Sequence, residues 1–193
     1  MTQAGAPVHG AILLAAGASR RLGFPKQLIE VDGEPLLRRV ARALLATEPL
    51  DCLVVLGHEA ERMRAALDGL ALRSIVADDH ARGMSASLAA GIAAIDARCA
   101  AALVALTDQP ALDALHLRAL CDAWGAAPGH AVASAYADTR GVPAVLPRAW
   151  FAEIAQLRGD VGARDLLRAS DRAIKVIAAA ALERDLDRPE DLM

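Results

Sequence analysis

The chain has 193 residues, which is enough to bury one hydrophobic core without disulfides or a structural metal, so a single domain is expected over 1–193. A formal net charge of −3 gives no general attraction for nucleic acid or an anionic membrane, and aromatic residues, at 3%, are too few for a base-stacking surface. The three cysteines are odd in number and widely spaced, which argues against a disulfide scaffold. With no signal-peptide pattern and no apolar run near the roughly 18 residues of a membrane span, a cytoplasmic protein is expected.

Short apolar runs alternate with longer segments of helical periodicity, the pattern of a parallel sheet covered by helices. Strands are predicted at residues 8–15, 52–56, 73–77, 101–107, 131–136, 144–146 and 173–178. Helices are predicted at residues 35–46, 59–70, 84–97, 113–124, 148–157 and 162–169. The predicted fold is a Rossmann-like three-layer α/β sandwich with a mostly parallel sheet, in which the loops after the strands hold the ligand. Because the alternation is less regular after about Gly129, residues 129–193 are expected to elaborate the substrate site of the same domain.

The loop after the first predicted strand combines glycines with cations. Gly17 and Gly23 let backbone N–H groups approach an anion, and Arg20, Arg21 and Lys26 supply positive charge. The stretch contains neither the GxxxxGK[ST] loop nor the GxGxxG dinucleotide fingerprint. The residues alone therefore leave two interpretations open, a phosphate-binding loop and a solvated basic surface loop.

Acidic residues lie near the ends of two other predicted strands. Asp108 follows the strand at 101–107, where Pro110 ends the extended segment. Its carboxylate suits Mg²⁺, a hard cation with oxygen ligands, although an Asp that caps the next helix is an equal alternative. Asp185 and Asp187 project to the same side if the chain there is extended, or else form an acidic turn.

Two further segments place small and polar residues at predicted helix starts. In GMSASLAAGI, residues 83–92, Ser85 and Ser87 stand where free N–H groups are presented, with an N-cap as the alternative role of Ser85. RGDVGARDLL, residues 158–167, is by itself an ordinary glycine-rich turn with a capping Asp. The five histidines form no paired metal motif and are expected on the surface or in loops.

Several of these segments together resemble the molybdopterin nucleotidyltransferase family, whose fold is that of the nucleotide-diphospho-sugar transferases. LAAGASRRLGFPK, residues 14–26, is similar to the family signature L-A-[AG]-G-x-S-x-R-[ML]-G-x-x-K. GMSxSL, DQP, GDxGAR and DxDxPED segments follow in the family's order, so the resemblance covers residues 14–192.

The resemblance implies a role for each matching residue. The nucleotide would be bound by the opening loop, the serines and the acid of DQP, namely Leu14, Ala15, Ala16, Gly17, Arg20, Lys26, Ser85, Ser87 and Asp108. Arg20 and Lys26 would hold the phosphates and act in catalysis with Asp108, and Asp108 and Asp187 would bind Mg²⁺, with the role of Asp185 left open. The acceptor substrate would meet Gly159, Asp160, Gly162 and Arg164.

The reaction implied by the resemblance transfers CMP from CTP to the terminal phosphate of molybdopterin cofactor and releases pyrophosphate, with a molybdenum hydroxylase as the final recipient. Ala16 gives the cytidylyltransferase-like form of the loop, whereas guanylyltransferases that use GTP usually have glycine there. Val142 replaces the histidine of the family's Gly-His-Pro segment, so a contact that depends on that histidine does not carry over. GTP, another phosphorylated acceptor, and a non-catalytic accessory protein that binds the cofactor remain as alternatives.

Overall fold

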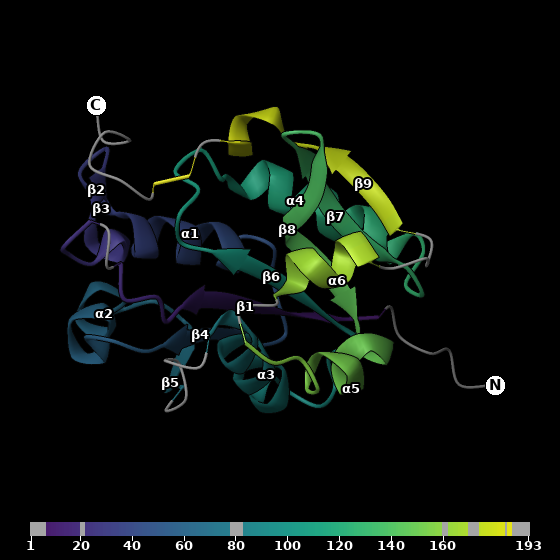
Figure 1. Cartoon of the computed structure of the whole chain (residues 1–193), viewed down its shortest axis with the longest axis horizontal. Coiled ribbons are helices and arrows are strands. Elements are labelled where there is room, and N and C mark those ends of the chain that lie inside the picture. The colour runs from purple at the N-terminus through teal and green to yellow at the C-terminus, as the bar shows by residue number, and fades with distance from the viewer. Residues whose placement is uncertain are drawn as a thin grey trace.

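The computed structural model describes residues 7–19, 22–77, 83–159, 162–169, 174–183 and 185–186. A seven-stranded sheet with the order β5-β4-β1-β6-β8-β7-β9 forms its centre (Figure 1). The strands are β1 (His9–Ala15), β4 (Cys52–Leu56), β5 (Arg73–Val76), β6 (Ala101–Leu106), β7 (Ala131–Tyr136), β8 (Thr139–Pro147) and β9 (Ile174–Ala178). β8 is antiparallel to its neighbours β6 and β7, and the other neighbouring pairs are parallel. The prediction of a mostly parallel α/β sheet is confirmed.

Helices cover both faces of this sheet. Figure 1 shows α1 (Leu36–Leu45) and α4 (Ala114–Gly125) on one side and α3 (Met84–Ala94) and α5 (Phe151–Ile154) on the other. α6 (Ala163–Ala169) packs on β8 and contributes to the same core as α3 and α5, and α2 (Ala60–Ala66) adds Met63 to the core below α1. The arrangement gives the three layers that the alternating sequence pattern predicts.

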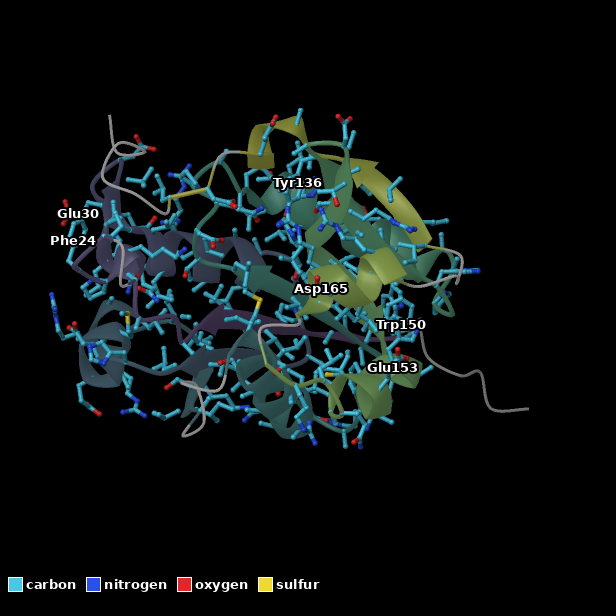
Figure 2. All side chains as sticks on the ribbon, viewed as in Figure 1. Phe24, Glu30, Tyr136, Trp150, Glu153 and Asp165 are labelled. Carbon is cyan, nitrogen blue, oxygen red and sulfur yellow. The ribbon has the colours of Figure 1, made fainter. Side chains whose placement is uncertain are left out.

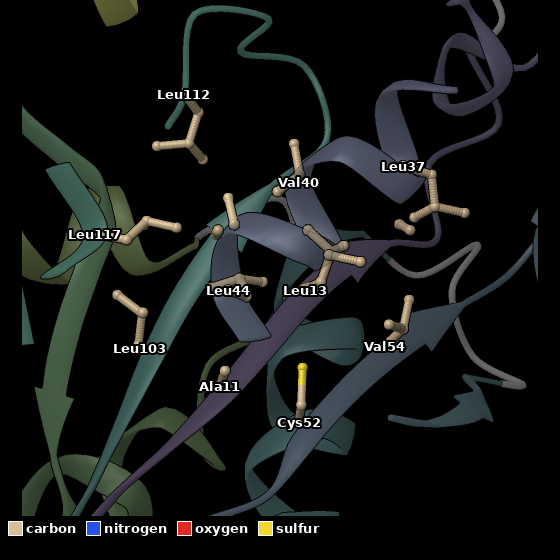
Figure 3. Close-up of a cluster of buried hydrophobic side chains, with 14 of the residues drawn as sticks. Ala11, Leu13, Leu37, Val40, Leu44, Cys52, Val54, Leu103, Leu112 and Leu117 are labelled. Atoms are coloured by element: carbon tan, nitrogen blue, oxygen red, sulfur yellow. The ribbon is translucent and has the colours of Figure 1, made fainter. Parts of the chain in front are cut away.

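The side chains of β1 show how a buried parallel strand separates two cores. Leu13 packs into the core under α1 and α4, whereas Ile12 and Leu14 pack into the core under α3, α5 and α6. In Figure 3, Leu13 lies close to Val40 of α1 within the first core. Successive residues of a strand point to opposite faces, so an uninterrupted apolar run is what a sheet buried on both sides requires.

Several elements differ from their predicted bounds. The strand predicted at 144–146 extends over Thr139–Pro147 and forms a hairpin with β7, through Ala137 and Asp138, which have φ angles of 49° and 54°. Positive φ at both central residues is the geometry of a tight two-residue hairpin, here without the usual Asn-Gly or Asp-Gly signal. The helix predicted at 148–157 is a 3-10 turn, η3 (Arg148–Trp150), followed by the single turn of α5.

Short elements that the sequence patterns do not predict complete the fold. They are η1 (Lys26–Leu28), η4 (Ala180–Glu183) and a two-residue ribbon of β2 (Glu30–Val31) and β3 (Glu34–Pro35). Within the described ranges, no helix combines the length and the hydropathy needed to cross a bilayer.

An ion pair at the amino ends of β4 and β5 also connects these strands to the chain that follows α3. The guanidinium of Arg73 donates to both carboxylate oxygens of Asp51, at 2.9 and 2.6 Å, and the backbone N–H of Asp96 donates to the same carboxylate at 2.9 Å. The hydrogen bonds from Arg73 hold the pKa of Asp51 below its ordinary value.

We expect this carboxylate to make the stability of the protein depend on pH. Because its pKa is lower in the folded state, its contribution is complete above the unfolded pKa of about 3.9 and is lost as the pH falls through the folded value. The free energy of unfolding, measured by urea titration at several pH values, should decline less steeply with acid in Asp51→Asn than in the wild type. The exposed Asp68→Asn provides the control, and an identical acid dependence of Asp51→Asn and wild type would contradict the assignment.

Candidate active site

Two residues far apart in sequence meet beyond the carboxyl ends of adjacent strands. β1 and β6 are parallel neighbours with Leu14 opposite Leu106, and the chain after each strand leads to Lys26 and Asp108. Lys26 Nζ lies 3.0 Å from Asp108 Oδ2, and the two side chains are 15% and 18% exposed. The structure thus brings together the first loop and the first acidic segment that the sequence singles out.

The loop between β1 and Lys26 is held in shape by Gln27, which sequence reasoning did not identify. Gln27 is 1% exposed, and its Nε2 donates to the carbonyl of Ala15 at 3.1 Å and to that of Gly17 at 2.8 Å. The Ser19 hydroxyl donates to Gln27 Oε1 at 3.3 Å and accepts the backbone N–H of Lys26 at 3.0 Å. One buried amide therefore fixes both ends of the described part of the loop.

Replacing Gln27 by Ala should destabilise the protein. The change removes three hydrogen bonds and leaves the carbonyl of Ala15 without this partner, for which we expect a loss of about 2 to 3 kcal/mol in the free energy of unfolding. Denaturant titration measures the loss. Gln156→Ala, at an exposed position of the same residue type, should change stability by less than about 0.5 kcal/mol. Equal stabilities of the two variants would contradict the role of Gln27.

A first cavity of about 290 Å³ lies against this loop. Its lining includes Leu14, Ala16, Gly17, Lys26, Ser87 and Asp108, which are six of the residues expected to bind nucleotide. Ala15 is not part of this lining, because its side chain is 1% exposed in the core under α1. Its link to the loop is the carbonyl that accepts from Gln27.

Ser85 has a partner that neither of its predicted roles includes. The N-cap of α3 is Gly83, without a side-chain cap, so the N-cap alternative for Ser85 is wrong. The Ser85 hydroxyl donates to the carbonyl of Gly159 at 2.7 Å, and neither residue lines the first cavity. Ser87 does line that cavity.

A second cavity of about 330 Å³ adjoins the first and shares Leu14, Met84, Leu106 and Asp108 with it. Its other side is formed largely by α6 and the hairpin, and Tyr136 of β7 and Asp165 of α6, both labelled in Figure 2, are among its lining residues. Gly162 and Arg164, two of the residues expected to meet the acceptor, also line it. Arg20, Asp160 and Asp187 lie outside the described residues.

Val142, which replaces the family's histidine, is a buried residue that contacts Tyr136 through its backbone. The Val142 side chain is 6% exposed and packs in the core under α3, and its carbonyl accepts the Tyr136 hydroxyl at 2.8 Å. Burial raises the pKa of Tyr136, which keeps the phenol protonated as the donor. A Cβ on Gly141 would lie 2.8 Å from the Tyr136 oxygen, so a larger residue there would displace this hydroxyl.

Asp108 fits a cation rather than a helix cap. The N-cap of α4 is Asp113, whose carboxylate accepts the N–H of His116 at 2.8 Å. Asp108 Oδ2 accepts from Lys26, whereas Oδ1 is buried without a hydrogen-bond partner among the described residues. A buried carboxylate oxygen without a partner is costly, and a divalent cation with oxygen ligands would satisfy it.

The C-terminal segment contacts the backbone of Asp108. The backbone N–H of Leu186 donates to the carbonyl of Asp108 at 2.8 Å, and Asp185 lines the second cavity. In the described ranges, no three His, Cys, Asp or Glu side chains form a metal-binding group. The second predicted ligand, Asp187, lies beyond the described segment.

Two histidines differ from the expectation of surface or loop positions. His9 in β1 and His116 in α4 are half-buried, and their rings contact Thr47 at 3.0 Å and Ser134 at 2.8 Å. Burial lowers the pKa of both rings. These side chains take part in internal packing.

Comparison with known proteins places this site in a family context. Nicotine blue oxidoreductase of Paenarthrobacter nicotinovorans is 31% identical over 197 residues, covering 96% of this chain and 95% of that protein. A probable molybdenum cofactor guanylyltransferase of Natronomonas pharaonis is 38% identical over 105 residues, covering 53% of this chain and 50% of that protein.

Among solved structures, Rv0371c from Mycobacterium tuberculosis H37Rv has a TM-score of 0.85 and 28% identity, covering 97% of this chain and 96% of that one. A structure of the same mycobacterial protein in complex with manganese has a TM-score of 0.81 and 26% identity, covering 96% of each chain. The sequence model of the MobA-like NTP transferase domain matches residues 11–174. Since this match spans most of the chain, the protein belongs to the MobA-like family of nucleotidyltransferases.

Proposed function

We propose that the protein transfers CMP from CTP to the terminal phosphate of a molybdopterin-type acceptor in the cytoplasm and releases pyrophosphate. The observation that carries the proposal is the contact of Lys26 with Asp108, at 3.0 Å, where Asp108 lines both cavities. The first cavity would hold the nucleotide and the second the acceptor, so the phosphorus under attack would lie near Asp108. A molybdenum hydroxylase would then receive the nucleotidylated cofactor.

The residues of the two cavities suit a reaction that depends on positioning and charge. The attacking phosphate oxygen is already largely ionised near pH 7, because the second pKa of a phosphate monoester is about 6, so no serine nucleophile or histidine base is needed. Lys26, together with Arg20, would neutralise the triphosphate, and the loop that Gln27 fixes would hold the nucleotide in line with the acceptor.

Asp108 and Asp187 would hold a divalent cation. When bound, Mg²⁺ or Mn²⁺ would supply Lewis-acid stabilisation of the developing phosphate charge. Among the described residues the Oδ1 of Asp108 has no hydrogen-bond partner, which supports a ligand at this position. The manganese complex of the mycobacterial protein makes Mn²⁺ a sensible first metal to compare with Mg²⁺.

The acceptor side of the proposal concerns residues 129–193. Most of the lining of the second cavity comes from this part of the chain, including Tyr136, Arg164 and Asp185. We propose that this region supplies the acceptor-binding part of a single domain, with two arginines of α6, Arg164 and Arg168, facing an anionic acceptor.

The choice of CTP over GTP can be tested at Ala16, which lines the first cavity and is 7% exposed. Removing its methyl group in Ala16→Gly should admit a larger base, and the ratio of kcat/KM for CTP to that for GTP should fall by about tenfold. Competition kinetics with both nucleotides measure the ratio. Ala18→Gly, an exposed position in the same loop, should leave it unchanged, and a constant ratio in Ala16→Gly would contradict the base assignment.

The function itself is tested with purified protein, molybdopterin cofactor, CTP or GTP, and Mg²⁺ or Mn²⁺, by following pyrophosphate release. We expect metal-dependent release with CTP. The relative named nicotine blue oxidoreductase, which this chain covers over 95% of its length, supplies the competing outcome. Oxidation or reduction of a redox dye without pyrophosphate release would overturn the proposal. Cofactor binding without nucleotide turnover would instead favour a non-catalytic accessory protein.

A further inference from the structure

The first turn of α3 forms a wall common to both cavities. Met84, its first residue, lines the first cavity and the second. Ser87, one turn further along the helix, lines the first cavity but not the second. Between them, Ser85 is 2% exposed and lines neither.

Ser85 binds the segment that precedes α6. Its hydroxyl donates to the carbonyl of Gly159 at 2.7 Å, and its backbone N–H donates to the same carbonyl at 3.3 Å. Gly159 has φ +71°, a conformation that favours glycine and that presents this carbonyl to α3. Ser85, on the helix that borders the nucleotide cavity, therefore satisfies the carbonyl of Gly159, in the segment expected to meet the acceptor.

A second contact brings the start of α6 against the same turn. A Cβ on Gly162 would lie 2.8 Å from Met84 Sδ, which shows how closely the backbone of Gly162 approaches that side chain. The backbone N–H of Gly162 donates to the carboxylate of Asp165 at 3.0 Å. This hydrogen bond links the position of Gly162 to the first turn of α6. Arg164 lies within that turn and lines the second cavity.

The rest of α6 is anchored independently of Ser85. Leu166 and Leu167 are 8% and 0% exposed in the core under α3 and α5, and α6 packs on β8. Loss of the Ser85 hydroxyl would therefore leave the helix formed and docked. Gly159, which precedes its first turn, would lose the shorter of its two hydrogen bonds from Ser85 and would be held less firmly from the α3 side.

We propose that Ser85 is a positioning residue that sets the acceptor-binding end of α6 relative to the nucleotide cavity. It acts through Gly159 and not through contact with nucleotide, in contrast to the role that the family resemblance implies for it. This inference rests on the proposed function, in which the second cavity binds the acceptor. It assigns to Ser85 an effect on acceptor use that is separate from nucleotide binding.

Hydrogen exchange of the ligand-free protein tests the contact without any activity. In Ser85→Ala, amides of α6 should exchange faster than in the wild type, because the hydrogen bond from the hydroxyl is gone. Ser87→Ala is the matched control, a buried serine of the same helix, and should leave the exchange of α6 unchanged. Unchanged exchange of α6 in Ser85→Ala would overturn the proposal.

Steady-state kinetics test the consequence. Ser85→Ala should lower kcat/KM for the acceptor by about tenfold, the effect of one lost hydrogen bond, while the Kd for CTP changes by less than about twofold. Ser87→Ala should show the reverse pattern. Ser85→Cys retains the approximate volume with a weak donor and should resemble Ser85→Ala; recovery of wild-type kinetics would mean that volume, and not the hydrogen bond, matters, which overturns the proposal.

A variant of the other partner covers the case in which Ser85→Ala fails to fold. Gly159→Ala strains the φ of +71° without changing α3, and apart from its chain neighbours no described residue has a heavy atom within 4 Å of the added methyl group. It should show the same selective loss of acceptor kcat/KM, and equal losses for acceptor and CTP would count against the positioning role. If the wild type releases no pyrophosphate with any substrate pair, the proposed function fails, whereas the exchange of α6 still decides whether Ser85 holds this segment.

Discussion

Replacing Asp108 by Asn should lower the turnover of the enzyme at least about 100-fold, the loss that follows removal of a major electrostatic contact at a reacting centre. The amide keeps the shape of the carboxylate but has no negative charge for Lys26 or for a divalent cation. Lys26 Nζ lies 3.0 Å from Oδ2, and Oδ1 is buried without a partner among the described residues. Oδ2 is therefore paired with a cation, and Oδ1 is placed to accept another.

The fold should tolerate this change. The backbone carbonyl of Asp108, which accepts from Leu186, is unaffected by the substitution. Pyrophosphate release measures turnover, and thermal unfolding verifies the fold. Asp113→Asn, five residues along the chain, is the matched control, because Asn caps a helix about as well as Asp and should leave turnover unchanged. Full activity of folded Asp108→Asn would refute both the metal assignment and the catalytic role.

The strands that could be predicted most accurately are those buried on both faces. The predicted bounds 52–56 and 131–136 coincide with β4, a continuous apolar run, and with β7, which is apolar except for Ser134, because both lie within a covered sheet. β8 is predicted only over 144–146, in its apolar second half, because its first residues, Thr139 and Arg140, give no hydrophobic signal. Their place in the sheet comes from pairing with β7, which a local pattern does not contain.

The same limit separates the predicted site residues from those that were missed. Lys26 and Asp108 follow neighbouring strands and belong to recognisable motifs, so both could be predicted. Gln27 belongs to no motif that we considered, and its importance depends on burial and on carbonyls 10 and 12 residues away. The partner of Ser85 is Gly159, 74 residues distant, and a serine at a helix start has several local roles that fit equally well.

The electrostatic character of the site is also local rather than global. A chain with a net charge of −3 has no general attraction for a triphosphate, so an anionic substrate must be held by particular cations. Lys26 lines the first cavity and could be such a cation, and Arg164 and Arg168 line the second. Anions that enter from the two sides would meet at Asp108, where a divalent cation would offset their repulsion.

Replacing Lys26 by Met should therefore raise the KM for CTP by roughly 10- to 100-fold, the range for a hydrogen bond to a charged group of about 1.5 to 3 kcal/mol. Met retains most of the aliphatic chain and removes the charge, so the loop that Gln27 and Ser19 hold should keep its shape. Initial rates at varied CTP concentration give the KM, and calorimetry gives the Kd for CTP without acceptor.

The sequence offers an unusually close control, because it contains only one other lysine, Lys175. Lys175 is exposed on β9, and its Nζ lies 3.4 Å from the carbonyl of Ala123, so Lys175→Met should leave the KM for CTP unchanged. With two lysines, chemical acylation provides a second measurement: bound CTP should slow the modification of Lys26 and not that of Lys175. If CTP protects neither lysine and Lys26→Met binds CTP normally, the triphosphate does not lie against Lys26, and the first cavity would have to bind another part of the substrate.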